Sequence, residues 1–176
     1  MVSMVEIIAP TQLSFPLIGA HPRYIVHKHK ASRLHYDLRL EFGASLFNLV
    51  LPKGPSIDPR VRRLAIRTHD HKKSCLTFEG RIPSGRYGAG PLLAWDHGRY
   101  ALRRPAQVSH EEAFTQGLTG GSIELIFDGA KLKGGWTLKR FDENWLFIKN
   151  PDCFASKVEI LELDKSVFSG RRVDDL

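Results

Sequence analysis

The stretch YIVHKHKASRLHYDLRLE, residues 24–41, decides how the chain is expected to fold. From Leu34 to Glu41, apolar and polar side chains alternate strictly. Successive side chains of a strand point to opposite faces, so the alternation predicts a strand with one apolar face and one polar face. The row expected on the core comprises Leu34, Tyr36, Leu38 and Leu40, and the polar row comprises His35, Asp37, Arg39 and Glu41.

Two further histidines lie just upstream of this strand. His27 and His29 share one parity and are separated from His35 by an expected turn at residues 30–33. Two histidines and one aspartate from neighbouring strands form a known ligand set for a divalent metal. The spacing leaves open whether His27 or His29 joins His35 and Asp37. Arg39, two residues beyond the aspartate, suits a phosphate held beside that metal.

On either side of this stretch, the sequence predicts many short strands separated by turns that contain Gly, Pro and Asp. Strands at this spacing predict a mainly β protein, a compact antiparallel β-barrel with one or two short peripheral helices. One helix is expected, from Ser109 as N-cap and Glu112 as its capping-box partner to Gly117 or Gly120. The expected strands are residues 24–29, 34–42, 46–51, 64–68, 76–78, 92–95, 99–102, 123–127, 136–140, 145–149 and 158–163.

The domain organisation follows from the same reading. Residues 1–22 are expected to be an irregular N-terminal arm, residues 23–168 a single barrel domain, and residues 169–176 a frayed polar tail. A chain of 176 residues is large enough for one hydrophobic core.

The composition favours a cytoplasmic protein that binds polyanions. The net charge is +7 and the pI is about 9.6, which suits nucleic acid. Cys75 and Cys153 form no CxxC pair and are expected to stay reduced. No apolar stretch is long enough to cross a bilayer, and the first ten residues do not resemble a signal peptide.

A second set of cations is expected near the metal. Lys53 lies in the stiff loop LPKGPS, residues 51–56. If the strand at residues 64–68 continues, Arg63, Arg67, His69 and His71 share one parity. The run GRYGAG, residues 85–90, lacks the Lys-Ser/Thr of a phosphate-binding P-loop and is expected to be a loop with several positive-φ positions.

The residues alone leave three functions open. A metal with Arg39, Lys53, Arg63 and His71 would bind a phosphate and hydrolyse its ester, with a histidine moving the proton. A His-x-Asp pair with a distal histidine is also the ligand set of a non-haem iron oxygenase. The third function is a basic nucleic-acid-binding module without catalysis. The surplus of cations favours phosphate.

The ordered motifs from 23 to 152 resemble the 3′-phosphoesterase domain of bacterial DNA ligase D and its stand-alone relatives. These motifs are HKHKASRLHYDLRLE, LPKGPSIDP, RLAIRTHDH, FEGRIPSGRYGAG, WDHGRY, GSIELIFDGAKLKGGWTLKR and NWLFIKN. The resemblance implies a compact β-barrel and a manganese-dependent activity on 3′ ends of DNA or RNA–DNA primers. That activity would remove a 3′-terminal ribonucleoside and then the remaining 3′-phosphate, leaving a 3′-OH for ligation in non-homologous end joining.

By motif position, the resemblance assigns His29, His35 and Asp37 to the metal, and so prefers His29 over His27. It assigns the scissile phosphate or its transition state to Arg39, Lys53, Arg63 and His71, with Arg39 and His71 as the catalytic pair. The expected protein is a free-standing phosphoesterase whose ligase, polymerase and end-binding partners are separate chains.

Three departures from the family pattern stand out. Residues 1–20 show no match to the acid- and arginine-bearing segment that serves the diesterase step, which makes phosphate removal the better supported activity. His69-Asp70-His71 stands where a glutamate and an aspartate often precede the late histidine, and Cys75 stands at a frequent tyrosine. The surroundings of the phosphate are therefore expected to differ from those in relatives.

Overall fold

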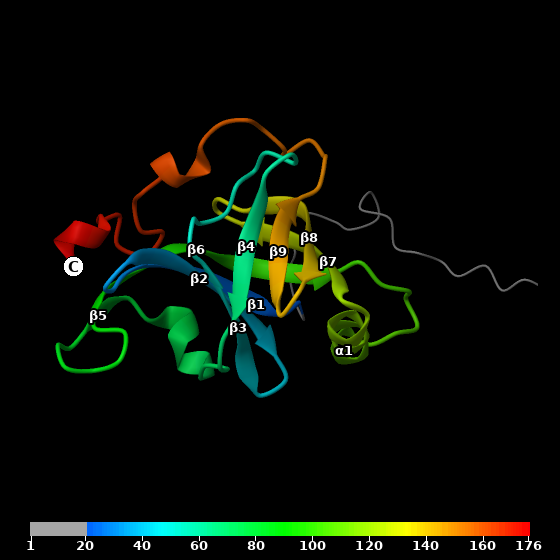
Figure 1. The fold of residues 1–176 in the computed structure, drawn as a ribbon, viewed down its shortest axis with the longest axis horizontal. Helices are drawn as coiled ribbons and strands as arrows, with labels where there is room; N and C mark the ends of the chain where they lie inside the picture. Colours follow the sequence, from blue (N-terminus) through cyan, green and yellow to red (C-terminus); the bar gives the residue numbers. More distant parts are fainter. Residues whose placement is uncertain (1–20) are drawn as a thin grey trace, which may run out of the picture.

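A computed structural model describes residues 21–176, so most of the expected N-terminal arm lies outside the described residues. The described part of the chain forms a nine-stranded antiparallel sheet and one α-helix, α1 (His110–Gly120) (Figure 1). The strands are β1 (Arg23–Lys30), β2 (Leu34–Phe42), β3 (Ser45–Leu51), β4 (Arg62–Arg67), β5 (Gly80–Ile82), β6 (Gly90–Leu102), β7 (Ser122–Gly129), β8 (Lys133–Phe141) and β9 (Asn144–Lys149).

Eight of these strands close into a barrel, as the sequence predicts. The order is β1-β2-β3-β4-β9-β8-β7-β6, and β1 pairs with β6 to close it, while β5 extends the sheet beyond β6. Each barrel strand contributes to one buried cluster, β4 through Ala65 alone and the others through alternate residues. In β2 these are Tyr36, Leu38 and Leu40, which are at most 4% exposed, whereas Leu34 at the strand's start is 47% exposed.

Helix α1 packs against one end of the barrel. Ser109 is its N-cap and accepts a hydrogen bond from the Glu112 backbone N–H, as the capping pattern predicts. The helix ends at Gly121, which adopts the left-handed conformation with φ 73°. Phe114 enters the main core and stacks on Phe42 at a ring-centroid distance of 4.4 Å.

The expected break between residues 92–95 and 99–102 is wrong, because β6 runs through Asp96-His97-Gly98 without a turn. All three residues pair with β1, and Gly98 also pairs with β7. A Cβ at Gly98 would lie 2.1 Å from the Asp128 carbonyl oxygen, so glycine serves close strand approach here. Asp96 is buried and accepts hydrogen bonds from the Tyr24 hydroxyl at 2.6 Å and the Leu132 N–H at 2.9 Å.

Three other local predictions are also wrong. Residues 76–78 form no strand, because Leu76 belongs to the 3₁₀ helix η2 (Lys73–Thr77). Within residues 158–163 a 3₁₀ helix forms, η3 (Ile160–Glu162). The tail is not frayed: η4 (Val173–Asp175) buries Val173 in the main core, and Lys30 pairs with Asp174 at 2.5 Å. Its end lies beside β5, where Arg81 donates to the Leu176 carbonyl at 2.8 Å (Figure 1).

A smaller apolar cluster lies on the outer face of the barrel. Ile25 of β1, Leu46 of β3 and Ala94 of β6 are buried there against Leu76. This contact seats η2. Hydrogen bonds from His27 to the Phe78 carbonyl and from His29 to the Gly88 carbonyl, with the bridge between Leu46 and His71, place the covering segment, residues 68–90, against β1 and β3. The polar row of β2 therefore faces a covered space instead of open solvent. None of the described helices is long and apolar enough to span a membrane.

Candidate metal and phosphate site

A cavity of about 490 Å³ lies between the outer face of β1–β3 and the covering segment. Its lining comes from β1, β2 and β3, from the turn between β1 and β2, from the end of β5 and the loop after it, and from the residues after β4. It is lined by His29, Ala31, Ser32, His35, Asp37, Arg39, Asn48, Val50, Thr68, His69, His71, Ile82, Arg86, Tyr87, Gly88 and Ala89.

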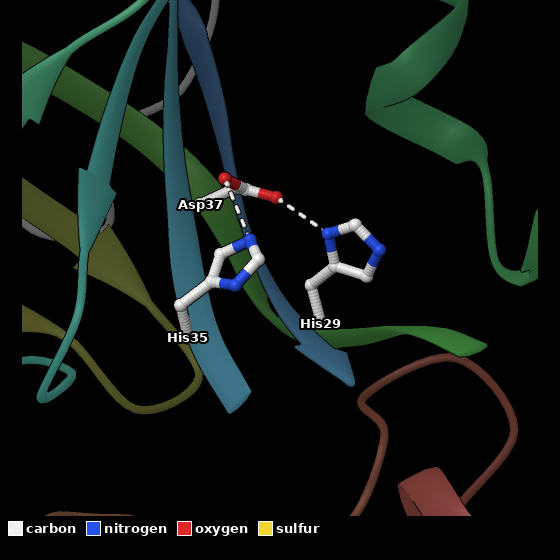
Figure 2. A group of neighbouring side chains, drawn as sticks. All are labelled: His29, His35 and Asp37. Atoms are coloured by element: carbon white, nitrogen blue, oxygen red, sulfur yellow. Dashed lines mark ion pairs between the residues drawn. The ribbon is translucent and has the colours of Figure 1, made fainter. Parts of the chain in front are cut away.

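His29, His35 and Asp37 converge on one point of this cavity (Figure 2). His29 of β1 stands opposite His35 of β2 in the strand register, and their ring centroids are 4.7 Å apart. The Asp37 carboxylate is 3.5 Å from His29 Nδ1 and 3.7 Å from His35 Nε2. One ligand atom from each of the three side chains lies within 4.8 Å of the others, so the group can hold a metal ion.

The hydrogen bonds of His29 and His35 leave free, in each ring, the nitrogen that faces Asp37. His29 Nε2 lies 2.8 Å from the Gly88 carbonyl, and His35 Nδ1 lies 3.0 Å from the Arg33 carbonyl. A carbonyl only accepts, so each of these nitrogens carries the proton. In the neutral rings the lone pairs are then on His29 Nδ1 and His35 Nε2, the two atoms that face Asp37. Such outer hydrogen bonds are typical of metal-binding histidines.

Asp37 is ionised at neutral pH although it is only 4% exposed. Burial raises the pKa of its carboxyl, but the contact with His29 and the charge of Arg39 outweigh this and hold the pKa below its usual range. One buried anion and two imidazole lone pairs are a donor set suited to a divalent cation. The residues present therefore fit a divalent metal ion.

Arg39 is fixed beside the triad by three side chains. It is 5% exposed, and its Nη2 donates to Asp37 at 3.3 Å, its Nε to Asn48 at 3.2 Å, and its Nη1 to His27 Nδ1 at 2.8 Å. His27 is fully buried, and its Nε2 donates to the Phe78 carbonyl at 2.8 Å. His27 thus does not belong to the triad and holds the guanidinium from behind. Burial and the neighbouring Arg39 charge lower the pKa of His27 to about 3, so the ring is neutral.

His71 lines the cavity from the segment that follows β4. Its backbone forms a bridge with Leu46 of β3, in which the two N–H···O distances are 2.8 and 3.0 Å. Its ring lies 4.6 Å from that of His69, centroid to centroid. Burial and the charges of Arg39 and His69 lower the pKa of His71 to about 4. His71 is therefore a neutral imidazole at pH 7, able to accept a proton.

The second basic row does not form as one face. Strand β4 ends at Arg67, so His69 and His71 leave the strand and line the cavity, whereas Arg63 pairs with Phe147 of the core. Cross-strand partners point to the same side of a sheet, which places Arg63 on the face opposite the cavity. The cavity lining, drawn from residues 21–176, includes neither Arg63 nor Lys53; Lys53 is exposed just beyond the end of β3.

Several residues that line the cavity are not predicted from the sequence. Asn48 lies on the cavity face of β3, where it accepts from Arg39 and donates to Thr68. In the sequence, Asn48 alternates in step with Leu46 and Val50, and this pattern could have placed all three on one face of the strand. Arg86 and Tyr87 lie in the glycine-rich loop, whose Gly85, Gly88 and Gly90 have positive φ as expected. Cys75 packs against the outer apolar cluster instead of lining the cavity.

The class of protein is thus a closed antiparallel β-barrel that carries, beside a buried arginine, a two-histidine, one-carboxylate group able to hold a metal ion. The chain belongs to the DNA ligase D 3′-phosphoesterase domain family, whose pattern matches residues 27–140. This confirms the family resemblance that the ordered motifs predict.

The relatives are much longer proteins. The "Multifunctional non-homologous end joining protein LigD" of Pseudomonas aeruginosa is 40% identical over 148 residues, which cover 81% of this chain and 17% of that protein. The protein of the same name from Mycolicibacterium smegmatis is 34% identical over 141 residues, 78% of this chain and 18% of that protein. The "Multifunctional non-homologous end joining DNA repair protein LigD" of Mycobacterium tuberculosis is 34% identical over 138 residues, with 78% and 17% covered. This chain thus spans less than a fifth of each of these relatives.

Proposed function

We propose that the protein is a metal-dependent phosphoesterase that processes 3′ ends of DNA or RNA–DNA primers. It would remove a 3′-terminal ribonucleoside as a phosphodiesterase, and the resulting 3′-phosphate as a phosphomonoesterase, to leave a 3′-OH. The observation that carries this proposal is the meeting of His29, His35, Asp37, Arg39 and His71 in one cavity. Membership of the 3′-phosphoesterase family supports the same reaction class.

In this proposal His29, His35 and Asp37 hold the metal, for which we favour Mn2+. When bound, the ion would supply Lewis-acid polarisation of a phosphoryl oxygen. Nitrogen and carboxylate ligands in one set suit a transition metal better than Mg2+, which prefers oxygen. Asp37 would neutralise part of the ion's charge, and the Gly88 and Arg33 carbonyls would keep both imidazoles oriented.

Arg39 would bind the scissile phosphate and stabilise the negative charge of its transition state. Its three donor contacts keep the guanidinium in place before substrate arrives, so little ordering is needed during the reaction. His71 would accept a proton or donate a hydrogen bond on the other side of the phosphate, since it is neutral at pH 7. We place the exposed Lys53 on a phosphate of the strand beyond the cavity, which the net charge of +7 on the chain favours. Arg63 lies on the face opposite the cavity and has no phosphate contact in this proposal.

The relatives' names point to a role in joining broken DNA ends. We propose that this chain prepares 3′ ends in non-homologous end joining, together with ligase, polymerase and end-binding activities, in the cytoplasm. Its substrate would be a nucleic-acid end and not a membrane component.

The deciding experiment uses a labelled primer-template with either one 3′-ribonucleotide or a 3′-phosphate. It is incubated with the protein and Mn2+, Mg2+ or a chelator, and the 3′ end is analysed. We expect Mn2+-dependent conversion of both ends to 3′-OH. Unchanged ends with every metal, together with retained binding, would instead favour a nucleic-acid-binding module. Consumption of a 2-oxoacid with Fe2+ would favour the oxygenase.

A further inference from the structure

The glycine-rich loop after β5 presents an aromatic ring that the proposed mechanism does not use. Tyr87 is 95% exposed, whereas the described part of the chain holds no other large apolar side chain more than 66% exposed. No hydrogen bond, ion pair or ring contact is formed by this side chain within residues 21–176. Yet Tyr87 lines the mouth of the cavity that contains the triad.

The loop that carries this ring is closely tied to the metal-binding group. The Gly88 carbonyl accepts the hydrogen bond from His29 Nε2 at 2.8 Å. A Cβ at Gly88 would lie 3.3 Å from His29 Cε1, so the loop backbone touches the imidazole. Tyr87 is therefore one residue, about 3.8 Å of chain, from a contact with a triad histidine.

Internal turns give the loop a definite shape. The Arg86 N–H bonds to the Pro83 carbonyl at 3.3 Å, and the Ala89 N–H bonds to the Arg86 carbonyl at 3.1 Å. Gly85 and Gly88 take positive φ on either side of the pair Arg86-Tyr87, which suits two consecutive turns. The result is an exposed arginine and an exposed tyrosine held side by side at the cavity mouth.

We propose that Tyr87 is a stacking platform for the base next to the processed 3′-phosphate, with the Arg86 guanidinium against the adjoining backbone phosphate. An aromatic ring beside a cation is the usual means of holding single-stranded nucleic acid, and every base offers a flat face to such a ring. The contact is therefore independent of base identity. It explains how a cavity suited to one phosphate selects a nucleic-acid end over other phosphate esters. The inference rests on the proposed function.

The test compares Tyr87→Ala, Tyr87→Phe and wild type on 3′-phosphorylated strands with Mn2+. One strand has ordinary bases at its last two positions, and the other has abasic residues there. We expect Tyr87→Ala to raise KM on the first strand about 5- to 150-fold with little change in kcat, and to leave KM on the abasic strand unchanged. Tyr87→Phe keeps the ring and should behave as wild type. Phe141→Ala, which removes a 53% exposed aromatic at the β8–β9 turn, is the matched control and should also behave as wild type.

A second readout needs neither metal nor turnover. Stacking of a 3′-terminal 2-aminopurine on Tyr87 should quench its fluorescence in wild type and Tyr87→Phe, but not in Tyr87→Ala. An unchanged KM in Tyr87→Ala, or an equal loss on the abasic strand, would overturn the stacking platform while leaving the esterase intact. If wild type processed no end at all, the proposed reaction would fail, and the fluorescence series would still decide whether Tyr87 binds a base.

Discussion

The hydrogen bond between His27 and Arg39 gives the sharpest prediction from the structure. His27→Leu would keep the apolar volume of the ring approximately but remove the acceptor 2.8 Å from Arg39 Nη1. Arg39 is 5% exposed, so water cannot easily replace the lost partner. A hydrogen bond to a charged group is worth about 1.5–3 kcal/mol, and an unpaired buried N–H costs a similar amount.

If Arg39 acts mainly in the transition state, this loss should appear in turnover. One factor of ten corresponds to about 1.4 kcal/mol, so the single-turnover rate of His27→Leu should fall about 10- to 150-fold. The three side chains proposed to hold the metal remain, so Mn2+ affinity should stay close to wild type. His27→Gln restores an acceptor in the same direction and should recover most of the rate.

The assay is single-turnover removal of a 3′-phosphate at saturating Mn2+, with Mn2+ binding measured separately by calorimetry. The effect should also disappear in an Arg39→Ala background, because coupled residues are not additive. A rate for His27→Leu within about twofold of wild type would refute the positioning role. So would an equal further loss from His27→Leu in the Arg39→Ala protein.

Four other outcomes are expected. Asp37→Asn removes the only carboxylate of the described triad and should abolish Mn2+ binding by calorimetry together with metal-dependent turnover; full activity would mean that the ligands are misassigned. The hydrogen bond that Glu41 accepts from Arg23 lowers the pKa of Glu41 from 4.5 to about 2. The stabilising effect of the Glu41 carboxylate is therefore complete above pH 4.5 and is lost as the pH falls toward 2. Glu41→Gln should therefore cost about 1 kcal/mol in urea unfolding at pH 7, allowing for solvent screening, and nothing near pH 2. Phe114→Ala should cost about 3–5 kcal/mol in the same measurement, and a loss below 1 kcal/mol would contradict its burial in the main core. Gly98→Ala should cost about 1–3 kcal/mol because its Cβ would meet the Asp128 carbonyl, and an unchanged melting temperature would count against that close approach.

The sequence by itself determined the parts of the fold that depend on local periodicity. The alternation of residues 34–41 specifies strand β2 and separates its core row from its polar row. It also places Asp37 and Arg39 on one face, because side chains two apart in a strand share a direction. The capping pattern at Ser109 and Glu112 specifies the start of α1 for a similarly local reason.

Tertiary structure decided which local signals were overruled. Asp96-His97-Gly98 is typical of a turn, yet pairing with β1 on one side and β7 on the other keeps it extended. The apolar side chain of Leu76 suggests a strand, but it packs on the outer face of the barrel from a 3₁₀ helix. Pairings and contacts between residues far apart in the chain leave no periodic mark, so no local pattern could reveal them.

The same limit applies to the candidate site. Spacing places His27 and His29 on one face of β1 and cannot rank them. The choice depends on contacts 51 and 59 residues away, since His27 bonds to the Phe78 carbonyl and His29 to the Gly88 carbonyl. Sequence supplied the donor atoms of the triad. The pairing of β1 with β2 and the carbonyls of the covering segment together decided which nitrogen of each ring faces Asp37 or Arg39.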